Sequence, residues 1–172
     1  MTAAAVALVG LAVALRPPSQ LGVAEGRCRA NEPGPAVLVT AAGLRDRQGH
    51  LTLEIYPPDD RDFLVDDRVL IEHGKVFRRV YAPLPPQGPV RVCIRVPRPG
   101  PYSLSLLHDR DSNAKFGFLG DGIGFAGNPQ LGWFKPRAEA ARVNAGPGIT
   151  AITVVMNYRH GLFSFSPLRS TR

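Results

Sequence analysis

The chain has 172 residues, a formal net charge of +7 and 44% hydrophobic residues. This length fits one domain of ordinary size, and the apolar content excludes a disordered chain. The 18 glycines and 17 prolines argue against a helical protein, because proline lacks a backbone donor and glycine weakens helices. Short strands joined by tight turns are therefore predicted.

The positive charge does not follow the pattern of a nucleic-acid-binding protein. Basic residues are scattered singly or in pairs such as Arg78 and Arg79, and the acidic stretch at residues 57–68 interrupts them. The sequence also lacks an aromatic RNA-binding strand and a recognition-helix pattern. We predict no nucleic-acid partner, and expect the partner to be an unidentified envelope component or a small ligand.

Residues 1–24 have the pattern of a secretory signal peptide. Their apolar run, residues 3–15, is shorter than the roughly 20 residues that span a membrane. A small-x-small cleavage site ends at Ala24, before Glu25. No lysine or arginine precedes the apolar run, so a tethering or packed N-terminal helix is the alternative. We predict no membrane span, and export to the periplasm or the medium.

Alternating apolar residues and turn signals predict about seven strands along the rest of the chain. They cover residues 36–44, 51–56, 75–84, 89–96, 102–109, 139–145 and 149–158. The first two strands are expected to form one hairpin. The fourth and fifth are expected to form another, across the proline-glycine turn at residues 97–101. A short helix is expected within residues 66–74, where Gly74 would end it.

These elements predict an all-β fold, because no helical repeat of any length occurs among them. The economical arrangement is a single-domain antiparallel two-sheet sandwich over residues 36–158, immunoglobulin-like or transthyretin-like. Tyr102 follows the proline-glycine turn and is expected to pack and hydrogen-bond back across that corner. Residues 159–172 would form a C-terminal appendage, with Phe163 and Phe165 as its docking residues.

The sequence has two cysteines, Cys28 and Cys93, and an oxidising compartment favours a disulfide between them. Apolar and polar side chains alternate within residues 89–96, and Cys93 falls on the arginine-bearing side, away from the core. A disulfide would therefore hold the N-terminal tail, residues 25–35, across the outer face of a sheet. The alternative is a free thiol that the neighbouring arginines make reactive.

Residues 109–136 form a connection of 28 residues, long enough that function or internal packing must explain it. Asp109, Asp111 and Asn113 alternate at its start, like the first three ligands of a calcium loop. The alternative is that these side chains end the preceding strand by hydrogen bonds to nearby backbone. A metal site at these three residues is the prediction to test.

The rest of the calcium-loop pattern is missing. Ala114 stands where the loop needs a glycine, and Gly120 stands where a bidentate carboxylate belongs. Asp121 comes one residue late for that role. We therefore expect a weak calcium site at most, completed by water or by distant carboxylates, and no other cofactor.

The sequence contains no complete catalytic pattern. His108 beside Asp109 suggests part of a triad, but strand alternation puts Ser103 and Ser105 on the opposite face, and no G-x-S-x-G motif occurs. The glycines of residues 122–127 match G-x-G-x-x-G without a helix after them, which excludes a dinucleotide site. We predict that the protein is not an enzyme.

The long connection carries enough apolar side chains to fold down on one end of the sandwich as a lid. These side chains are Phe116, Phe118, Ile123, Phe125, Trp133 and Phe134. Either the segment is a packed cover, or it exposes Trp133 in a binding loop. The residues predicted for a binding loop are His108, Lys115, Phe125, Asn128 and Trp133.

Two stretches, HDRDSNAKFG at residues 108–117 and DGIGFAGNP at residues 121–129, resemble an exported bacterial family, domain of unknown function 2141. The resemblance covers roughly residues 37–158. Positions that match the family pattern are Asp109, Asn113, Lys115, Gly124, Phe125 and Asn128. Ala114 and Gly117 replace a glycine and an aspartate of that pattern. The resemblance implies a secreted or periplasmic sandwich, and it assigns no activity and no catalytic residues.

The sequence thus favours an exported, non-enzymatic module of the periplasm or envelope, with a binding or structural role. The alternative is a calcium- or ligand-dependent enzyme or carrier that uses residues 109–133.

Overall fold

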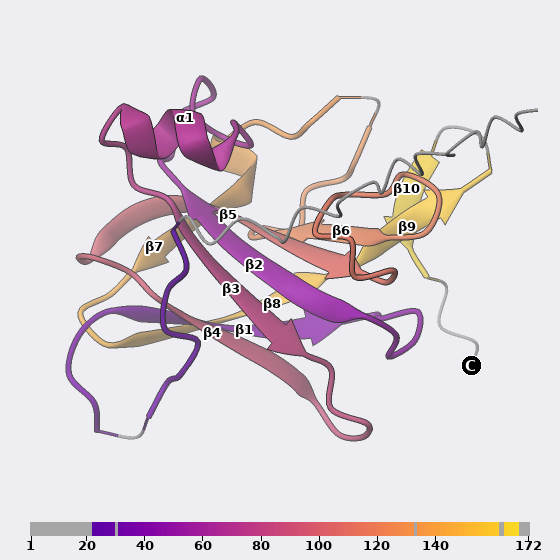
Figure 1. Ribbon diagram of the computed structural model, residues 1–172, viewed down its shortest axis with the longest axis horizontal. Helices are drawn as coiled ribbons and strands as arrows, with labels where there is room; N and C mark the ends of the chain where they lie inside the picture. Colours follow the sequence, from indigo (N-terminus) through magenta and orange to yellow (C-terminus); the bar gives the residue numbers. More distant parts are fainter. Residues whose placement is uncertain (1–21, 30, 133, 162–163, 169–172) are drawn as a thin grey trace, which may run out of the picture.

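Ten strands form two sheets that pack face to face (Figure 1), in a computed structural model that describes residues 22–29, 31–132, 134–161 and 164–168. The predicted all-β sandwich is confirmed. The small sheet has the order β4-β1-β8, and its strands are β1 (Ala36–Ala42), β4 (Val90–Arg95) and β8 (Ile149–Val155). The N-terminal apolar run lies outside the described residues.

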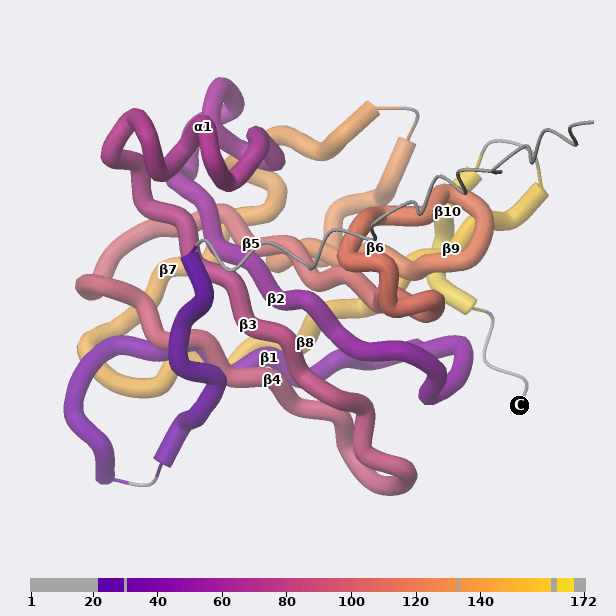
Figure 2. Tube along the Cα trace, in the orientation of Figure 1, coloured from indigo at the N-terminus to yellow at the C-terminus, as the bar shows by residue number. Residues whose placement is uncertain are grey.

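The large sheet has the order β10-β9-β6-β5-β2-β3, and β7 also pairs with β5. Its strands are β2 (His50–Tyr56), β3 (Arg78–Pro83), β5 (Gly100–Asp109), β6 (Gly122–Phe125), β7 (Arg142–Ala145), β9 (Asn157–His160) and β10 (Ser164–Pro167). The strands β6, β9 and β10 lie together at one end of this sheet (Figure 2).

The core lies between the two sheets and follows the alternation of the sequence. Leu53 of β2, Leu106 of β5 and Ile94 of β4 are fully buried there. Side chains at the intervening positions face outward, as expected for strands that bury one face. Cys93 and Arg95 accordingly lie on the outer side of β4, where the N-terminal tail covers them.

Both predicted hairpins are wrong. β1 pairs with β4 and β8 in the small sheet, whereas β2 pairs with β3 and β5 in the large one. The connections from β1 to β2 and from β4 to β5 therefore cross between sheets. Alternation identifies the buried face of each strand, but both sheets bury a face against the same core. For this reason the pattern did not identify the pairing partners.

The predicted strand at residues 149–158 divides between the two sheets. Its first part, β8, pairs in parallel with β1, and its second part, β9, joins the large sheet. The amide of Met156 donates to the Ala42 carbonyl at 2.9 Å. The side-chain amide of Asn157 donates to the carbonyls of Ile123 and Val155. These bonds hold the chain at the point where it changes sheets.

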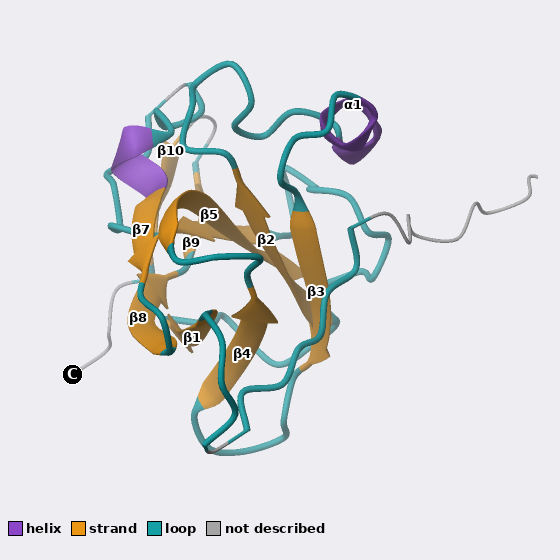
Figure 3. Ribbon diagram, turned by 90° about the vertical axis from the view of Figure 1, so that its left-hand side faces the viewer, coloured by secondary structure: helices purple, strands orange, loops and turns teal. Residues whose placement is uncertain are grey.

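Two local predictions are confirmed. The Tyr102 hydroxyl donates to the Arg98 carbonyl at 2.7 Å, across the corner before β5. The short helix is α1 (Asp67–Glu72); the Asp66 side chain caps it, and Gly74 follows with a positive φ of 65°. Figure 3 shows α1 and the 3-10 helix η1 (Glu139–Ala141), which precedes β7, in the upper part of the molecule.

Cys28 and Cys93 form the predicted disulfide, with Cα atoms 5.7 Å apart. It fastens the N-terminal tail to the outer side of β4, and the Cys93 side chain is buried beneath that tail. Further upstream, the Gly22 carbonyl accepts from the Arg79 amide, and the Ala24 amide donates to the Arg79 carbonyl, both at 2.8 Å. Cleavage after Ala24 would remove both of these partners of β3.

A second group of buried side chains lies on the outer face of the large sheet, under α1 and η1. It consists of Tyr56, Phe63, Leu70, Phe77, Phe125, Ala138 and Ala141. The rings of Tyr56 and Phe63 meet edge to face, as do those of Phe63 and Phe125. This outer cluster brings apolar surface from residues 56–77 to the edge of β6.

Candidate functional site

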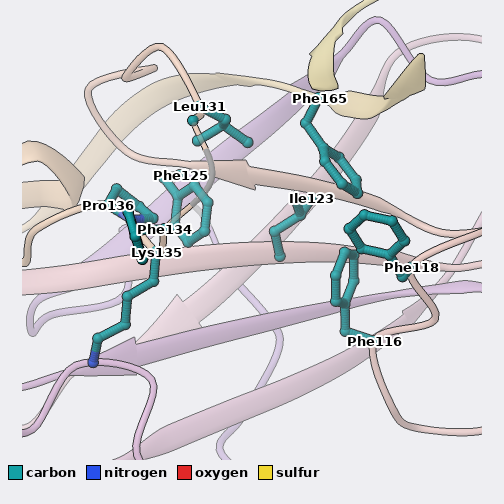
Figure 4. Close-up of a pocket in the computed structure, with 10 residues that line it drawn as sticks. Phe116, Phe118, Ile123, Phe125, Leu131, Phe134, Lys135, Pro136 and Phe165 are labelled. Carbon is teal, nitrogen blue, oxygen red and sulfur yellow. The ribbon is translucent and has the colours of Figure 1, made fainter. Parts of the chain in front are cut away.

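An apolar pocket of about 330 Å³ opens on the outer face of the large sheet beside β6 (Figure 4). Its apolar lining comes from the long connection and from β10: Phe116, Phe118, Ile123, Phe125, Leu131, Phe134, Pro136 and Phe165. Gly132 and Lys135 complete the lining. In Figure 4 the Lys135 amine points away from the rings. Accordingly, that amine donates to the Phe63 carbonyl at 2.6 Å.

The glycines of β6 determine which side chains face the pocket. A Cβ on Gly122 would lie 2.4 Å from the Tyr158 ring, and one on Gly124 would lie 2.5 Å from Val154. Neither position can hold a side chain on the core side of β6. Because strand neighbours alternate, Ile123 and Phe125 point outward to the pocket. These glycines also explain why β6 was not predicted: glycine is rare in strand interiors.

One wall of the pocket joins the loop after β5 to the C-terminal hairpin. The Phe165 ring lies 5.1 Å from that of Phe118 and 5.9 Å from that of Phe116. Arg159 of β9 is the cross-strand partner of Phe165. Its guanidinium carbon lies 4.9 Å from the centre of the Phe118 ring. A cation thus lies at the end of an aromatic wall.

Three aromatic rings of this pocket are well exposed to solvent. Phe134 is 89% exposed, and Phe116 and Phe118 are 46% and 47% exposed. Phe125, by contrast, is buried in the outer cluster and forms the floor. Contiguous exposed apolar surface of this kind marks binding sites on soluble proteins.

Two buried carboxylates shape the loop that carries Phe116 and Phe118. Asp109, fully buried, accepts the amides of Asn113 and Ala114 at 3.2 and 2.7 Å. Asp121 accepts the amides of Arg110 and Gly117 at 2.9 and 2.7 Å. The local hydrogen bonding that was the alternative to a metal site is therefore present.

The acidic residues of this loop also come together, although not as the predicted trio. Oxygen atoms of Asp109, Asp111 and Asp121 lie within 4.8 Å of one another. The Asn113 side chain instead donates to Asp111 and accepts from the Lys115 amide. Burial raises the pKa of the Asp109 carboxyl, and the hydrogen bond to Asp111 raises it further. Calcium at this cluster stays a prediction.

Thermal unfolding with and without millimolar calcium tests that prediction. A cation that binds only the folded state stabilises it by an amount that grows with the ratio of free cation concentration to dissociation constant, so calcium binding would raise the melting temperature. The same titration on Asp111→Asn should then show a smaller rise, because the substitution removes one carboxylate of the cluster. An unchanged melting temperature in the natural sequence removes the site.

His108 lies inside the sandwich rather than at the pocket. Its ring is fully buried, with Nδ1 2.6 Å from the Tyr158 hydroxyl and Nε2 2.9 Å from the Gln48 carbonyl. Because a carbonyl can only accept, we assign the proton to Nε2, and Nδ1 then accepts from Tyr158. The Tyr158 oxygen accepts the Arg45 amide at 3.0 Å. Thus His108 ties the connection after β1 to the large sheet.

We expect His108 to make the fold acid-sensitive. Burial lowers the pKa of His108 below its usual value, and Asp46, 3.8 Å from Nε2, opposes that shift only in part. The unfolded chain therefore binds a proton more readily, with a pKa of about 6.5. The free energy of unfolding should fall as the pH drops below that value, toward the folded-state pKa.

Urea unfolding at about pH 7 and pH 5 measures this loss. It should be smaller in His108→Gln than in the natural sequence. His73→Gln makes the same substitution at an exposed histidine. In this control the free energy of unfolding should fall as much as in the natural sequence. Equal losses in the natural sequence and in His108→Gln would contradict the assignment.

The serines near His108 do not complete a triad. Ser103 and Ser105 lie on the outer face of β5, as alternation predicted. The Ser103 hydroxyl donates to the Ala138 carbonyl at 2.8 Å, and the Ser105 hydroxyl contacts Glu54 at 3.4 Å. Both serines are buried, so their positions indicate structural roles.

A charged cluster on the same outer face fastens α1 to the sheet. Arg79 lies 2.6 Å from Glu54 and 2.7 Å from Asp67. The Tyr56 hydroxyl donates to Glu54 at 2.5 Å. Because these groups bind one another between β2, β3 and α1, their geometry indicates a structural network.

Two other predicted loop residues, Lys115 and Asn128, do not line the pocket. Lys115 is exposed next to Phe116. The Asn128 side chain accepts the Val155 amide at 2.7 Å and donates to the Thr153 carbonyl at 3.0 Å, which fastens the connection to the edge of β8. Trp133 lies outside the described residues.

Most of the aromatic residues of the pocket were predicted from the sequence, but other parts of the site were not. Leu131 carried no signal of its own, and neither did Arg159. The cross-strand position of Arg159 opposite Phe165 could have been found only by predicting the β9–β10 hairpin.

No curated protein and no solved structure matches the chain. Residues 39–153 match the family model DUF2141, described as an uncharacterized protein conserved in bacteria. The matched residues run from β1 to β8 and contain the whole connection 109–136 with both motifs. Since they make up about two thirds of the sequence, the resemblance is confirmed, and the chain belongs to this uncharacterised bacterial family.

Proposed function

We propose that the protein is an exported binding module of the bacterial envelope, and that its aromatic pocket binds the apolar part of a small ligand. The observation that carries this proposal is the pocket itself. Exposed rings from two separate segments converge on a concave surface above buried Phe125. A volume of about 330 Å³ lies at the lower end of the range for small-molecule sites.

The chemistry of the lining supports binding rather than catalysis. The charged residue that lines the pocket is Lys135, and its amine donates to the Phe63 carbonyl. An enzyme site needs polar groups that converge on the reacting atoms. The polar groups described above at His108 and at Glu54 are bonded within the fold instead.

One observation supports export. The disulfide between Cys28 and Cys93 is typical of proteins that fold in an oxidising compartment. Within the described part of the chain, no helix is long and apolar enough to cross a membrane.

Binding of the neutral apolar dye N-phenyl-1-naphthylamine tests the pocket. We expect saturable binding with enhanced dye fluorescence. Removing the exposed ring in Phe134→Ser should weaken binding about tenfold, because burying a phenylalanine contributes roughly 1.5–3 kcal/mol.

The matched control is Ile149→Ser, which changes a 44% exposed apolar residue on β8 of the small sheet. Its affinity for the dye should equal that of the natural sequence. If Phe134→Ser and Ile149→Ser bind the dye equally well, the dye does not occupy the pocket and the proposal fails.

A further inference from the structure

We propose that the ligand of the aromatic pocket is an uncharged amphiphile, an apolar chain joined to a hydroxyl-bearing head such as a sugar ring. The chain lies in the aromatic pocket, and the head lies in a second cavity beside it. The proposal rests on the apolar binding proposed above and adds the chemical class of the head. Its supports are the shared wall of the two cavities, the uncharged lining of the second cavity and the free hydrogen-bonding groups in it.

The second cavity adjoins the aromatic pocket. It has a volume of about 490 Å³ and lies between residues 128–131 and β10, beside Val155 and Asn157. Leu131 and Phe165 line both this polar cavity and the aromatic pocket. Both side chains lie along the upper side of the pocket in Figure 4. A ligand that fills the aromatic pocket can therefore extend past these two side chains into the polar cavity.

The lining of the polar cavity favours an uncharged head. Among the described residues that line it, none is charged, and its polar side chains are amides and hydroxyls: Asn128, Gln130, Asn157, Ser164 and Ser166. The rest of the lining is proline, leucine, valine and phenylalanine. An ionic head would be desolvated there without a partner charge, which is costly. The amides and hydroxyls can bond the hydroxyls of a sugar ring, and the apolar residues can pack on its C–H faces.

Two polar side chains of this cavity are free to bind a ligand. Gln130 is exposed and Ser166 is half-buried, and within the described part of the chain neither side chain forms a hydrogen bond. Asn128 and Ser164, by contrast, are bonded to backbone. A glutamine amide and a serine hydroxyl can each donate and accept. They therefore match head-group hydroxyls, which also donate and accept.

Calorimetric titration with octyl glucoside, below its micelle-forming concentration, and with octanol isolates the head, because both probes carry the same chain. We expect the protein to bind octyl glucoside about tenfold more tightly than octanol, the gain from two hydrogen bonds. Gln130→Ala and Ser166→Ala should each lower this preference about threefold, while octanol and the neutral dye bind as before. Gln87→Ala makes the same substitution at an exposed glutamine between β3 and β4 and should keep the preference.

Equal affinities for octyl glucoside and octanol in the natural sequence would overturn the head-group assignment, and dye binding would still support the aromatic pocket. A preference that survives in both Gln130→Ala and Ser166→Ala would also overturn it, since the head would then bind elsewhere. Octanoate tests the charge: it should bind no more tightly than octanol, and an affinity equal to that of octyl glucoside would refute an uncharged head. If neither the dye nor any of these probes binds, the proposed function itself fails.

Discussion

Replacing both cysteines, in Cys28→Ala with Cys93→Ala, lowers the free energy of unfolding by about 4 kcal/mol. The disulfide closes a loop of 65 positions, and its Cα separation of 5.7 Å is that of a relaxed bridge. Without the bridge, the unfolded chain regains the freedom of that loop. The tail also loses its covalent attachment to β4, so the hydrogen bonds from Arg95 to the carbonyls of Pro33 and Gly34 weaken.

Urea unfolding with and without a reducing agent measures this effect. The reducing agent should shift the transition of the natural sequence to lower urea and leave the double variant unchanged. A double variant that unfolds at the same urea concentration as the oxidised natural protein would contradict the prediction.

Gly122→Ala should destabilise the protein by about 2–3 kcal/mol, the upper part of the range for overpacking a core. Gly122 lies between His108 and Tyr158 in the register of β5, β6 and β9. Those side chains meet at 2.6 Å, across a strand that presents no side chain. A methyl group at Gly122 would lie 2.4 Å from the Tyr158 ring, so either the ring or the strand must move.

Gly120→Ala is the matched control, two positions earlier, in the turn before β6. A Cβ there would meet no atom within 4 Å, so the substitution should be neutral, or stabilising by up to about 1 kcal/mol. Chemical denaturation of both variants gives the comparison. Equal stability of the two variants would refute the packing argument.

Much of the fold could be predicted from local patterns. In residues 89–96, alternation alone identified the buried face and put Cys93 outside the core. Because the sequence has two cysteines, only one disulfide was possible. Tyr102 was predictable because a corner after a proline-glycine turn brings its hydroxyl back to the preceding backbone. The inferences about Cys93 and Tyr102 depend on neighbours within a few residues, whereas the disulfide follows from the number of cysteines.

Strand pairing was not predictable in the same way. The alternation in β1 is equally compatible with pairing to β2 or to β4, since both strands bury one face. The parallel contact with β8 depends on residues at the other end of the chain. β6 was missed because Gly122 and Gly124 disfavour a strand, and they are explained only by the bulk of Tyr158, Val154 and Met156.

The sequence predicted which residue types form the site, but it did not predict how they are arranged in space. Phe116 and Phe118 were expected to cover the sandwich, yet their packing partner Phe165 lies 49 positions beyond Phe116. The carboxylate cluster includes Asp121 rather than Asn113, because Ser112 and Ala114 adopt positive φ and turn the loop. Such turns at residues other than glycine leave little trace in sequence.

The small sheet can be completed only late in the synthesis of the chain. Ala36 of β1 lies opposite Ile149 of β8, 113 positions away, so one edge of β1 stays open until the C-terminal strands exist. Contacts at this separation slow folding, because a long loop must close before they form. During that delay the open edge is a template for a strand of another molecule. Association between newly made chains must therefore be prevented until β8 has paired with β1.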